Sequence, residues 1–233
     1  MDEKVKKLIV DLKSSDAKVR EAAVNSMIYE VNCDLSDAVA DLEKALSDSS
    51  AMVRWDSSKI LTQYYAKKKE WSRIALLLNS SNFEVKQGAS MFLQYVDAVN
   101  ESLLPVLERL LSDSYDAVKG DAAGVLAKYY VKKQDWNKIN ELVKHKDLLV
   151  KLGVTFHLKG VTLMGSDIAP VVPSLVLLLS DKDRALKEHT VGALSNYVDQ
   201  KPDNKKIVMS AITKSKIDKK LPEVQEIIKK CGA

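Results

Sequence analysis

The sequence contains few residues of the kinds that break or crosslink a chain. Its 233 residues include only 8 glycines and 5 prolines, too few for the tight turns that many short β-strands require. The two cysteines, Cys33 and Cys231, lie far apart and have no partner at zinc-ligand spacing. This excludes a disulfide framework and a zinc finger, and it favours a reducing compartment, the cytoplasm.

The chain also lacks a long apolar run. Its most apolar stretch, IAPVVPSLVLLL, contains two prolines and is shorter than the roughly 20 residues that span a bilayer. The amino-terminal stretch MDEKVKKLIVDLK is charged and periodic, unlike the apolar centre of a signal peptide. We therefore expect a soluble protein that does not enter a membrane.

Residues that commonly carry catalysis are sparse as well. The three histidines, His145, His157 and His189, fall in separate segments with no cysteine or histidine at metal-ligand spacing. The sequence has no glycine-rich phosphate loop and no nucleophile elbow. It predicts no catalytic residue, no metal site, no cofactor and no evident small-molecule substrate, and it favours a protein that is not an enzyme.

An excess of positive charge is confined to one end of the chain. The formal net charge is +4, but residues 201–233 hold nine lysines against four acidic residues. The remaining 200 residues hold 27 basic and 28 acidic ones. A surface that binds phosphates along the whole molecule would need more positive charge than this.

Aromatic residues make up only 6% of the chain, yet two aromatic segments are nearly identical: YYAKKKEW at 64–71 and YYVKKQDW at 129–136. They belong to a longer repeat, because LSDSSAMVRWDSSKILTQYYAKKKEW aligns with LSDSYDAVKGDAAGVLAKYYVKKQDW, and a third copy begins at Leu179. Three copies of a two-part unit of this length indicate a solenoid. We therefore expect Tyr64, Tyr129, Trp71 and Trp136 to pack in the core, with base stacking as the alternative.

Within each part, the apolar residues recur at helical spacing. A first helix is followed by a polar break that suits an N-cap, so we expect helices to end before Asp48–Ala51 and Asp113–Asp116. A second, longer helix then begins near a Val or Leu that is always followed by a basic residue. The six pairs are Val19 and Arg20, Val53 and Arg54, Val85 and Lys86, Val118 and Lys119, Val150 and Lys151, and Leu186 and Lys187.

This pattern resembles the HEAT-repeat family, including the HEAT-like repeats named after phycobilisome lyases. SDAKVREAAVNSM is the cleanest copy, and the resemblance extends from Val5 to Val198. It implies an all-α fold, an α-solenoid in which antiparallel helix pairs form a right-handed superhelix. Residues 1–200 would form six repeats in three two-repeat units, and residues 201–233 a basic helical cap. The family includes scaffolds, inhibitors, transport receptors and a few enzymes, so the resemblance implies little about function.

Helix geometry assigns the residues of each second helix to faces. The basic residue after each Val or Leu lies on one flank, and Asp56, Gly88, Asp121 and His189 lie on the opposite one. Because stacked helices bring opposite flanks together, we predict that Asp56 and Asp121 pair with basic residues of adjacent repeats. The alternative is that the basic flank forms a rail for phosphates.

The remaining face, toward the inner curve of a solenoid, is nearly neutral and partly apolar. We predict that it binds another protein, as a helix or a peptide segment. The predicted binding residues are Trp55, Lys59, Gln87, Met91, Gly120, Gly124, Leu152, Phe156 and Lys159. In this hypothesis the apolar side chains are anchors around a flat floor at Gly120 and Gly124. The alternative is that Leu152 and Phe156 are covered within the solenoid.

The predicted function is therefore a non-enzymatic scaffold that binds a partner protein in its concave groove. The alternative is nucleic-acid binding through the basic flank and the C-terminal cap, either along the backbone or as in the HEAT-like alkyl-purine DNA glycosylases. The sequence RWD at 54–56 superficially resembles the aromatic and acidic pair of those enzymes. The inner face has too little basic and aromatic character to favour this alternative.

Overall fold

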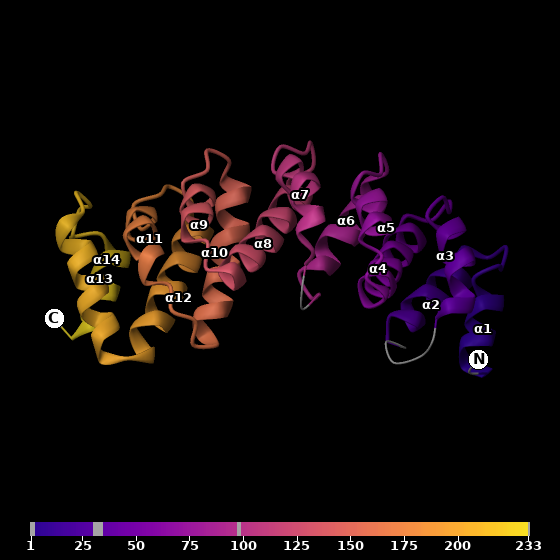
Figure 1. The fold of residues 1–233 in the computed structure, drawn as a ribbon, viewed down its shortest axis with the longest axis horizontal. Coiled ribbons are helices and arrows are strands. Elements are labelled where there is room, and N and C mark those ends of the chain that lie inside the picture. Colours follow the sequence, from indigo (N-terminus) through magenta and orange to yellow (C-terminus); the bar gives the residue numbers. More distant parts are fainter. Residues whose placement is uncertain (1–2, 30–34, 97–98, 233) are drawn as a thin grey trace. The chain divides into compact units, whose positions relative to one another are not determined.

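A computed structural model of the chain describes residues 3–29, 35–96 and 99–232, so Cys33 lies outside the described residues. Over these ranges the protein is all-helical and contains no β-strand, as the sequence predicts. The chain divides into two compact units, residues 1–121 and 122–233. Figure 1 labels the helices.

The first unit consists of short and long helices in alternation. In chain order they are α1 (Glu3–Asp11), α2 (Ala17–Ile28), η1 (Ser36–Ala38), α3 (Val39–Ala45), α4 (Ala51–Lys68), α5 (Trp71–Leu78), α6 (Phe83–Leu93), η2 (Glu101–Leu103), α7 (Leu104–Leu110) and the start of α8 (Asp116–Lys133). The breaks between α3 and α4 and between α7 and α8 confirm the predicted helix ends.

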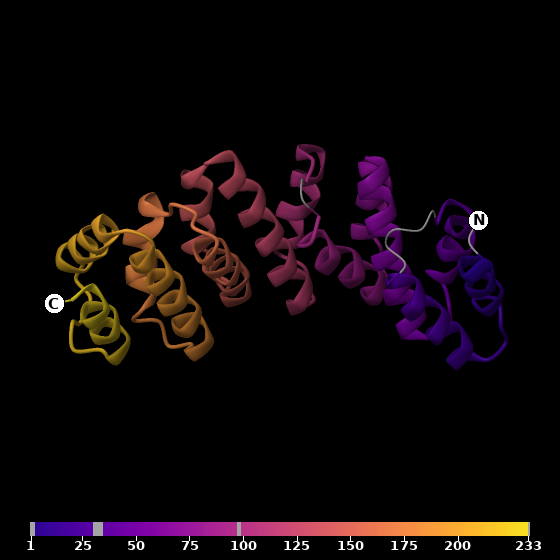
Figure 2. The same cartoon turned by 90° about the horizontal axis from the view of Figure 1, so that it is seen from below.

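The second unit continues the alternation and closes with two further helices. After the end of α8 come α9 (Trp136–Val143), α10 (Leu148–Leu163), η3 (Ala169–Val171), α11 (Val172–Leu178), α12 (Arg184–Gln200), α13 (Pro202–Lys214) and α14 (Pro222–Cys231). Both α13 and α14 contact α12, and Figure 2 shows them beside it at the C-terminal end. The boundary at residue 200 between repeats and cap remains a prediction.

The polar breaks begin the long helices as N-caps. The side chains of Ser50, Asn82 and Asp183 accept a hydrogen bond from the backbone N–H three residues further on. Asp16 and Asp147 accept one from the N–H two residues further on. These side chains satisfy backbone donors that the first turn of a helix leaves free.

The repeated aromatic segment ends a long helix and begins the next short one. Its second tyrosine is buried, at 3% exposure for Tyr65 and 6% for Tyr130, while Tyr64 and Tyr129 are half-buried. The lysines at the helix end lie over the rings of Tyr64 and Tyr129, as Lys68 and Lys133, each 5.6 Å from the ring centroid. The segment therefore serves packing, as predicted, but only its second tyrosine lies in the core. The first tyrosine is half-buried, and so are Trp71 and Trp136, which were also expected in the core.

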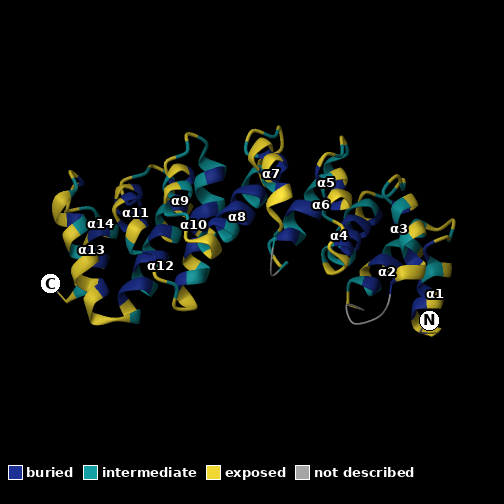
Figure 3. Ribbon diagram, viewed as in Figure 1, coloured by how far each residue is buried: buried dark blue, intermediate teal, exposed yellow. Residues whose placement is uncertain are grey.

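The cores lie where helices of neighbouring pairs meet, as the buried residues in Figure 3 show. The long helices α4 and α6 approach most closely at Gly88, where an added Cβ would be 2.5 Å from the backbone oxygen of Trp55. Beside this crossing, the buried hydroxyl of Ser58 donates to the backbone oxygen of Val85 at 2.6 Å. The absence of a side chain at Gly88 therefore allows this close approach.

Candidate functional site

In the first unit, the predicted binding residues are largely occupied by contacts within the chain. The ammonium of Lys59 lies 4.6 Å from the Trp55 ring centroid and 3.2 Å from the carboxylate of Asp56. The Trp55 ring also lies against Gly88, its Cδ1 3.1 Å from where a Cβ would be. Trp55 is therefore a half-buried packing residue beneath Lys59, and not the exposed anchor that the sequence suggests.

The other predicted residues of this unit offer little more surface. Gln87, Met91 and Gly120 are each half-buried. In the second unit, Gly124 is buried, so it does not present the flat, open floor expected of it. Of the two glycines predicted to form a flat floor, only Gly120 is partly exposed. The predicted binding residues that are most exposed lie in α10.

In the second unit, α10 exposes the apolar residues that the sequence places on its inner face. Phe156 is 60% exposed and Leu163 is 76% exposed, while Leu152 is half-buried and Lys159 is exposed. The alternative in which Phe156 is covered within the fold is therefore wrong. Leu152, Phe156, Lys159, Gly160 and Leu163 form what we call the α10 stripe, because residues three and four apart share one side of a helix.

Sequence reasoning missed Gly160 in this stripe. A Cβ built on Gly160 would meet no atom of a neighbouring segment within 4 Å. Its position, four residues after Phe156 and three before Leu163, was the available signal. The exposed Met164 at 86% directly follows the helix and extends the same apolar surface.

The α10 stripe carries one positive charge. The stem of Lys159 lies over Gly192 of α12, with its Cε 2.8 Å from where a Cβ would be. The ring of Phe156 also lies against α12, 5.5 Å from the ring of His189. The pKa of His189 is lowered, chiefly by burial and further by the Lys159 charge, so the imidazole is neutral at physiological pH.

The basic flank forms a ladder of ion pairs that connects successive repeats within each unit. The pairs between repeats are Arg20 with Asp48 at 2.7 Å, Arg54 with Glu84 at 3.0 Å, Lys86 with Asp113 at 2.5 Å, Lys151 with Asp181 at 2.6 Å, and Lys187 with Glu223. The sixth member, Lys119, pairs with Asp116 of its own helix at 3.0 Å. The basic flank therefore forms ion pairs within the protein, as predicted, and is not a free surface for binding phosphates.

The acidic partners of this ladder differ from those predicted. Asp56 is 3% exposed and pairs with Lys59 of its own helix. Asp121 accepts hydrogen bonds from Ser90 at 3.1 Å and Gln94 at 2.7 Å, with no ion pair to a basic residue among the described residues. The basic side chain lies near the start of its helix, so it reaches either the turn before a following helix, as at Asp48, or the first turn of that helix, as at Glu84.

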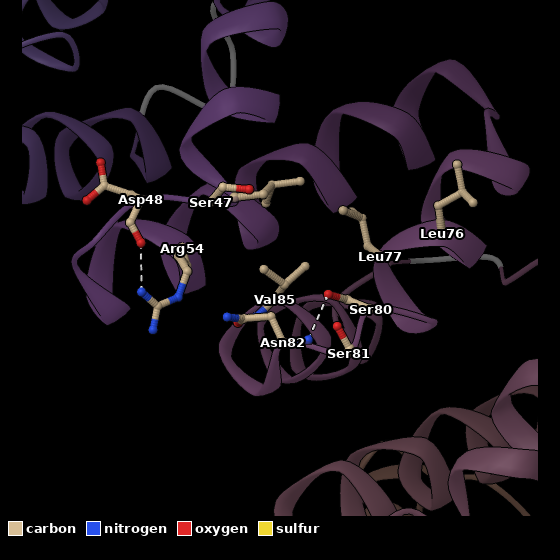
Figure 4. Close-up of a pocket in the computed structure, with 10 residues that line it drawn as sticks. Ser47, Asp48, Arg54, Leu76, Leu77, Ser80, Ser81, Asn82 and Val85 are labelled. Atoms are coloured by element: carbon tan, nitrogen blue, oxygen red, sulfur yellow. Dashed lines mark hydrogen bonds between the residues drawn. The ribbon is translucent and has the colours of Figure 1, made fainter.

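A cavity of about 560 Å³ lies among these turns in the first unit. Figure 4 shows Leu76 and Leu77 on one side of it and Arg54 on the other. Arg54 donates to the backbone oxygen of Asp48 at 2.7 Å and pairs with Glu84. Its Nε–H is buried and has no hydrogen-bond acceptor, but Glu84 already neutralises its charge, so no unpaired cation is among the residues that line the cavity.

The described ranges contain no assembled metal site. No group of three His, Cys, Asp or Glu side chains there could hold a metal ion. Burial, and secondarily the charge of Lys128, lowers the pKa of His157 to about 4, while His145 accepts a hydrogen bond from the Asp147 N–H. In the same ranges, no helix is both long enough and apolar enough to cross a membrane.

Comparison with known proteins identifies the fold. No protein-family model and no curated protein sequence matches the chain. Among solved structures, the complex of CpcE and CpcF of phycocyanin lyase from Nostoc sp. PCC7120 matches with a TM-score of 0.52 at 17% identity, over 98% of this chain and 93% of that one. This chain has the HEAT-like helical-repeat fold.

A second solved structure supports the same conclusion. An engineered protein matches with a TM-score of 0.50 at 17% identity, over 99% of this chain and 68% of that one. The fold that the sequence resemblance implies, a HEAT-like α-solenoid, is thereby confirmed. An identity this low establishes the HEAT-like fold and leaves the function to be argued from the surface.

Proposed function

We propose that this HEAT-like protein is a non-enzymatic scaffold and that it binds a partner protein through the α10 stripe of its second unit. The observation that carries the proposal is the exposure of Phe156 and Leu163, 60% and 76%, on one side of one helix. Single exposed apolar residues are common, but a row of them along a helix is typical of an interaction surface.

The likeness to a complex of two subunits, CpcE and CpcF, supports a role in protein association. Large aromatic and aliphatic side chains contribute most of the binding energy in such interfaces. From the predicted set we keep Leu152, Phe156 and Lys159 as the central contacts. Gln87, Met91 and Gly120 are a weaker second surface in the first unit.

The alternative function, nucleic-acid binding, would depend mainly on free cations along the basic flank. All six cations of the basic flank have an acidic partner within the chain. The lysines of residues 201–233 are the remaining basic region. If nucleic acid were the ligand, the logarithm of affinity would fall steeply with the logarithm of salt concentration.

The proposal is tested by substituting the anchors and measuring capture of a partner. A partner isolated from native extract with the wild-type protein should bind Phe156→Ala and Leu163→Ala more weakly by about 1–3 kcal/mol. The matched control is Leu76→Ala, since Leu76 is 63% exposed on α5 in the first unit. Equal binding by all three variants, with thermal unfolding unchanged, would remove the α10 stripe as the site.

A further inference from the structure

Gly160 is a glycine in the last turn of α10, and no contact within the described part of the protein requires a glycine there. It lies three residues before the end of α10, a helix of 16 residues. Glycine is unfavourable in a helix because it gains flexibility in the unfolded chain and contributes no side-chain packing. A Cβ at Gly160 would enter open space, so the fold itself would tolerate alanine or a larger residue there.

The two other long-helix glycines with known surroundings differ in this respect. A Cβ on Gly88 would be 2.5 Å from the Trp55 backbone oxygen, and a Cβ on Gly192 would be 2.8 Å from the Lys159 stem. Each of these glycines makes room for a neighbour within its own unit. By the same logic, Gly160 makes room for something that approaches α10 from outside.

The stripe around Gly160 has the shape of a helix-packing surface. Phe156 and Leu163 stand one turn before and one turn after the glycine, so they border a gap over the α10 backbone. Large residues that border a small one form the hole that receives a side chain of a second helix. An extended peptide would not fill such a gap in the same way, because extended peptides commonly bind by adding a strand to the free edge of a β-sheet.

Lys159 adds a charge requirement to this shape. Its inner-face neighbours on α12 are neutralised, since Glu188 pairs with Arg184 at 2.7 Å and Asp199 with Lys230 at 2.8 Å. Lys159 itself is exposed and has no ion pair with any described acidic residue, while its stem lies over Gly192. An unmatched cation at the border of an apolar surface favours a carboxylate on the partner.

We propose that the α10 stripe receives an amphipathic helix of the partner protein. A large apolar side chain of that helix sits over Gly160 between Phe156 and Leu163, and a neighbouring Asp or Glu pairs with Lys159. This inference rests on the proposed function and specifies the partner's secondary structure and charge. It requires no contribution from the first unit.

The test uses three labelled synthetic peptides of about 18 residues, five turns of helix. The first has Leu and Phe on one face with Glu beside them, the second has Lys in place of Glu, and the third is a scrambled acidic peptide without an apolar face. Fluorescence anisotropy measures their dissociation constants for the full-length protein. We expect the acidic amphipathic peptide to bind about tenfold more tightly than either of the others.

Two substitutions assign the binding to the proposed contacts. Gly160→Leu should weaken the acidic peptide about tenfold or more while leaving the protein at least as resistant to thermal unfolding. Its control is Ala40→Leu, at an exposed helical position of the first unit. Lys159→Met, which keeps the stem over Gly192, should abolish the preference for the acidic peptide, whereas Lys182→Met should preserve it.

The outcomes separate this inference from the proposed function. If both amphipathic peptides bind equally and Phe156→Ala weakens both, the charge requirement is wrong and the scaffold proposal stands. If Gly160→Leu leaves binding unchanged while Phe156→Ala weakens it, the helix-packing geometry is wrong. If the scrambled acidic peptide binds as tightly as the amphipathic one, or if no peptide binds and Phe156→Ala leaves partner capture unchanged, the whole inference is overturned.

Discussion

At the scale of single residues, the recurring LSD sequence is explained by an aspartate with two tasks. Asp48, Asp113 and Asp181 each accept a hydrogen bond from the backbone N–H two residues further on, which shapes the turn. Each also pairs with the basic residue of the preceding repeat. Hydrogen bonds from the neighbouring cation and from the backbone N–H donors of the turn hold the pKa of all three carboxyl groups below its usual value, against the opposing effect of burial.

The two tasks of Asp113 can be separated by substitution. Asp113→Asn keeps an oxygen that accepts from the Tyr115 N–H but loses the charge that pairs with Lys86. We expect it to lower the free energy of unfolding by about 1–2 kcal/mol, and Asp113→Ala by about 1 kcal/mol more. Urea unfolding measures both values, with Asp37→Asn at an exposed position as the control. Equal effects of the two variants would contradict the turn role.

Asp121 makes the free energy of unfolding fall as the pH rises, whereas an ion-paired carboxylate makes it rise. Burial raises its pKa to about 6, despite the hydrogen bonds from Ser90 and Gln94. Between the usual pKa near 3.8 and this raised value, the folded protein binds a proton that the unfolded chain releases. The contribution of Asp121 to stability is therefore full at low pH and is lost as the pH rises through this window.

Asp121→Asn tests this dependence. At pH 7 the variant should be more stable than wild type by about 1–2 kcal/mol, because it avoids burying a charge. The difference should shrink below about pH 4, where both side chains are neutral. Urea unfolding across this pH range gives the measurement. A variant less stable than wild type at pH 7 would mean that an unseen favourable interaction of the carboxylate outweighs its desolvation.

At the scale of secondary structure, α4 and α8 each end at a residue with a left-handed backbone conformation. Lys69 has φ 61° and Gln134 has φ 56°, and both occupy the same place in the repeated aromatic segment. A left-handed residue is a common helix stop, and glycine adopts it at the least cost. The repeat thus fixes a helix end without using glycine.

Lys69→Gly should therefore stabilise the protein. We expect the free energy of unfolding to rise by about 0.5–1 kcal/mol, because glycine adopts positive φ without steric cost. Lys67→Gly, two residues earlier in the last turn of α4, should lower it by up to about 1 kcal/mol. Thermal unfolding of both variants gives the comparison. A loss of stability in both would show that the helix propensity of glycine alone decides the outcome.

The helix crossings predict opposite effects at two glycines. Gly88→Ala places a methyl group against the backbone of α4, so we expect a loss of about 1–3 kcal/mol from overpacking. Gly160→Ala adds a methyl group in open space and should raise stability by about 0.5–1 kcal/mol. Chemical unfolding measures both. A stabilising Gly88→Ala would mean that α4 and α6 separate without loss.

At the scale of the whole molecule, stability comes from contacts between neighbouring helices. In the second unit, α11 contacts α9, α12 and α13, and α12 contacts α10 and α14. The stability of a repeat fold is approximately the sum of the stabilities of its repeats and of the interfaces between neighbours. A destabilising substitution therefore weakens the adjacent helices first. The ion pairs are local too, and they recur in every second repeat. Arg20, Lys86 and Lys151 each pair with the aspartate of the next LSD sequence.

A core cavity should therefore have a local effect. Leu175→Ala in α11 removes a fully buried side chain and should cost about 2–5 kcal/mol. Hydrogen exchange should quicken in the helices that α11 contacts and leave α2 and α4 near their wild-type rates. Uniformly faster exchange in both units would indicate that the chain unfolds as one cooperative body.

Much of the fold could be predicted from the sequence because its signals are local and repeated. Helical spacing of apolar residues, polar caps and three copies of one unit predicted the helix order and the breaks. The candidate site was predicted only in part: Phe156 and Lys159 are exposed as expected, whereas Trp55 is packed under Lys59 and Gly124 is buried. Helical spacing tells which side of its own helix a residue occupies, and nothing about what covers that side.

The sequence by itself determined the all-α repeat fold, the capped helix starts and the presence of a basic flank. These depend on backbone geometry and hydrogen bonds within a few residues of each position. Only the tertiary structure decided which acid meets each cation, which inner-face residues stay exposed, and that Gly160 faces open space. Those outcomes depend on the distance and offset between neighbouring helices, which the packing of side chains from both helices sets jointly.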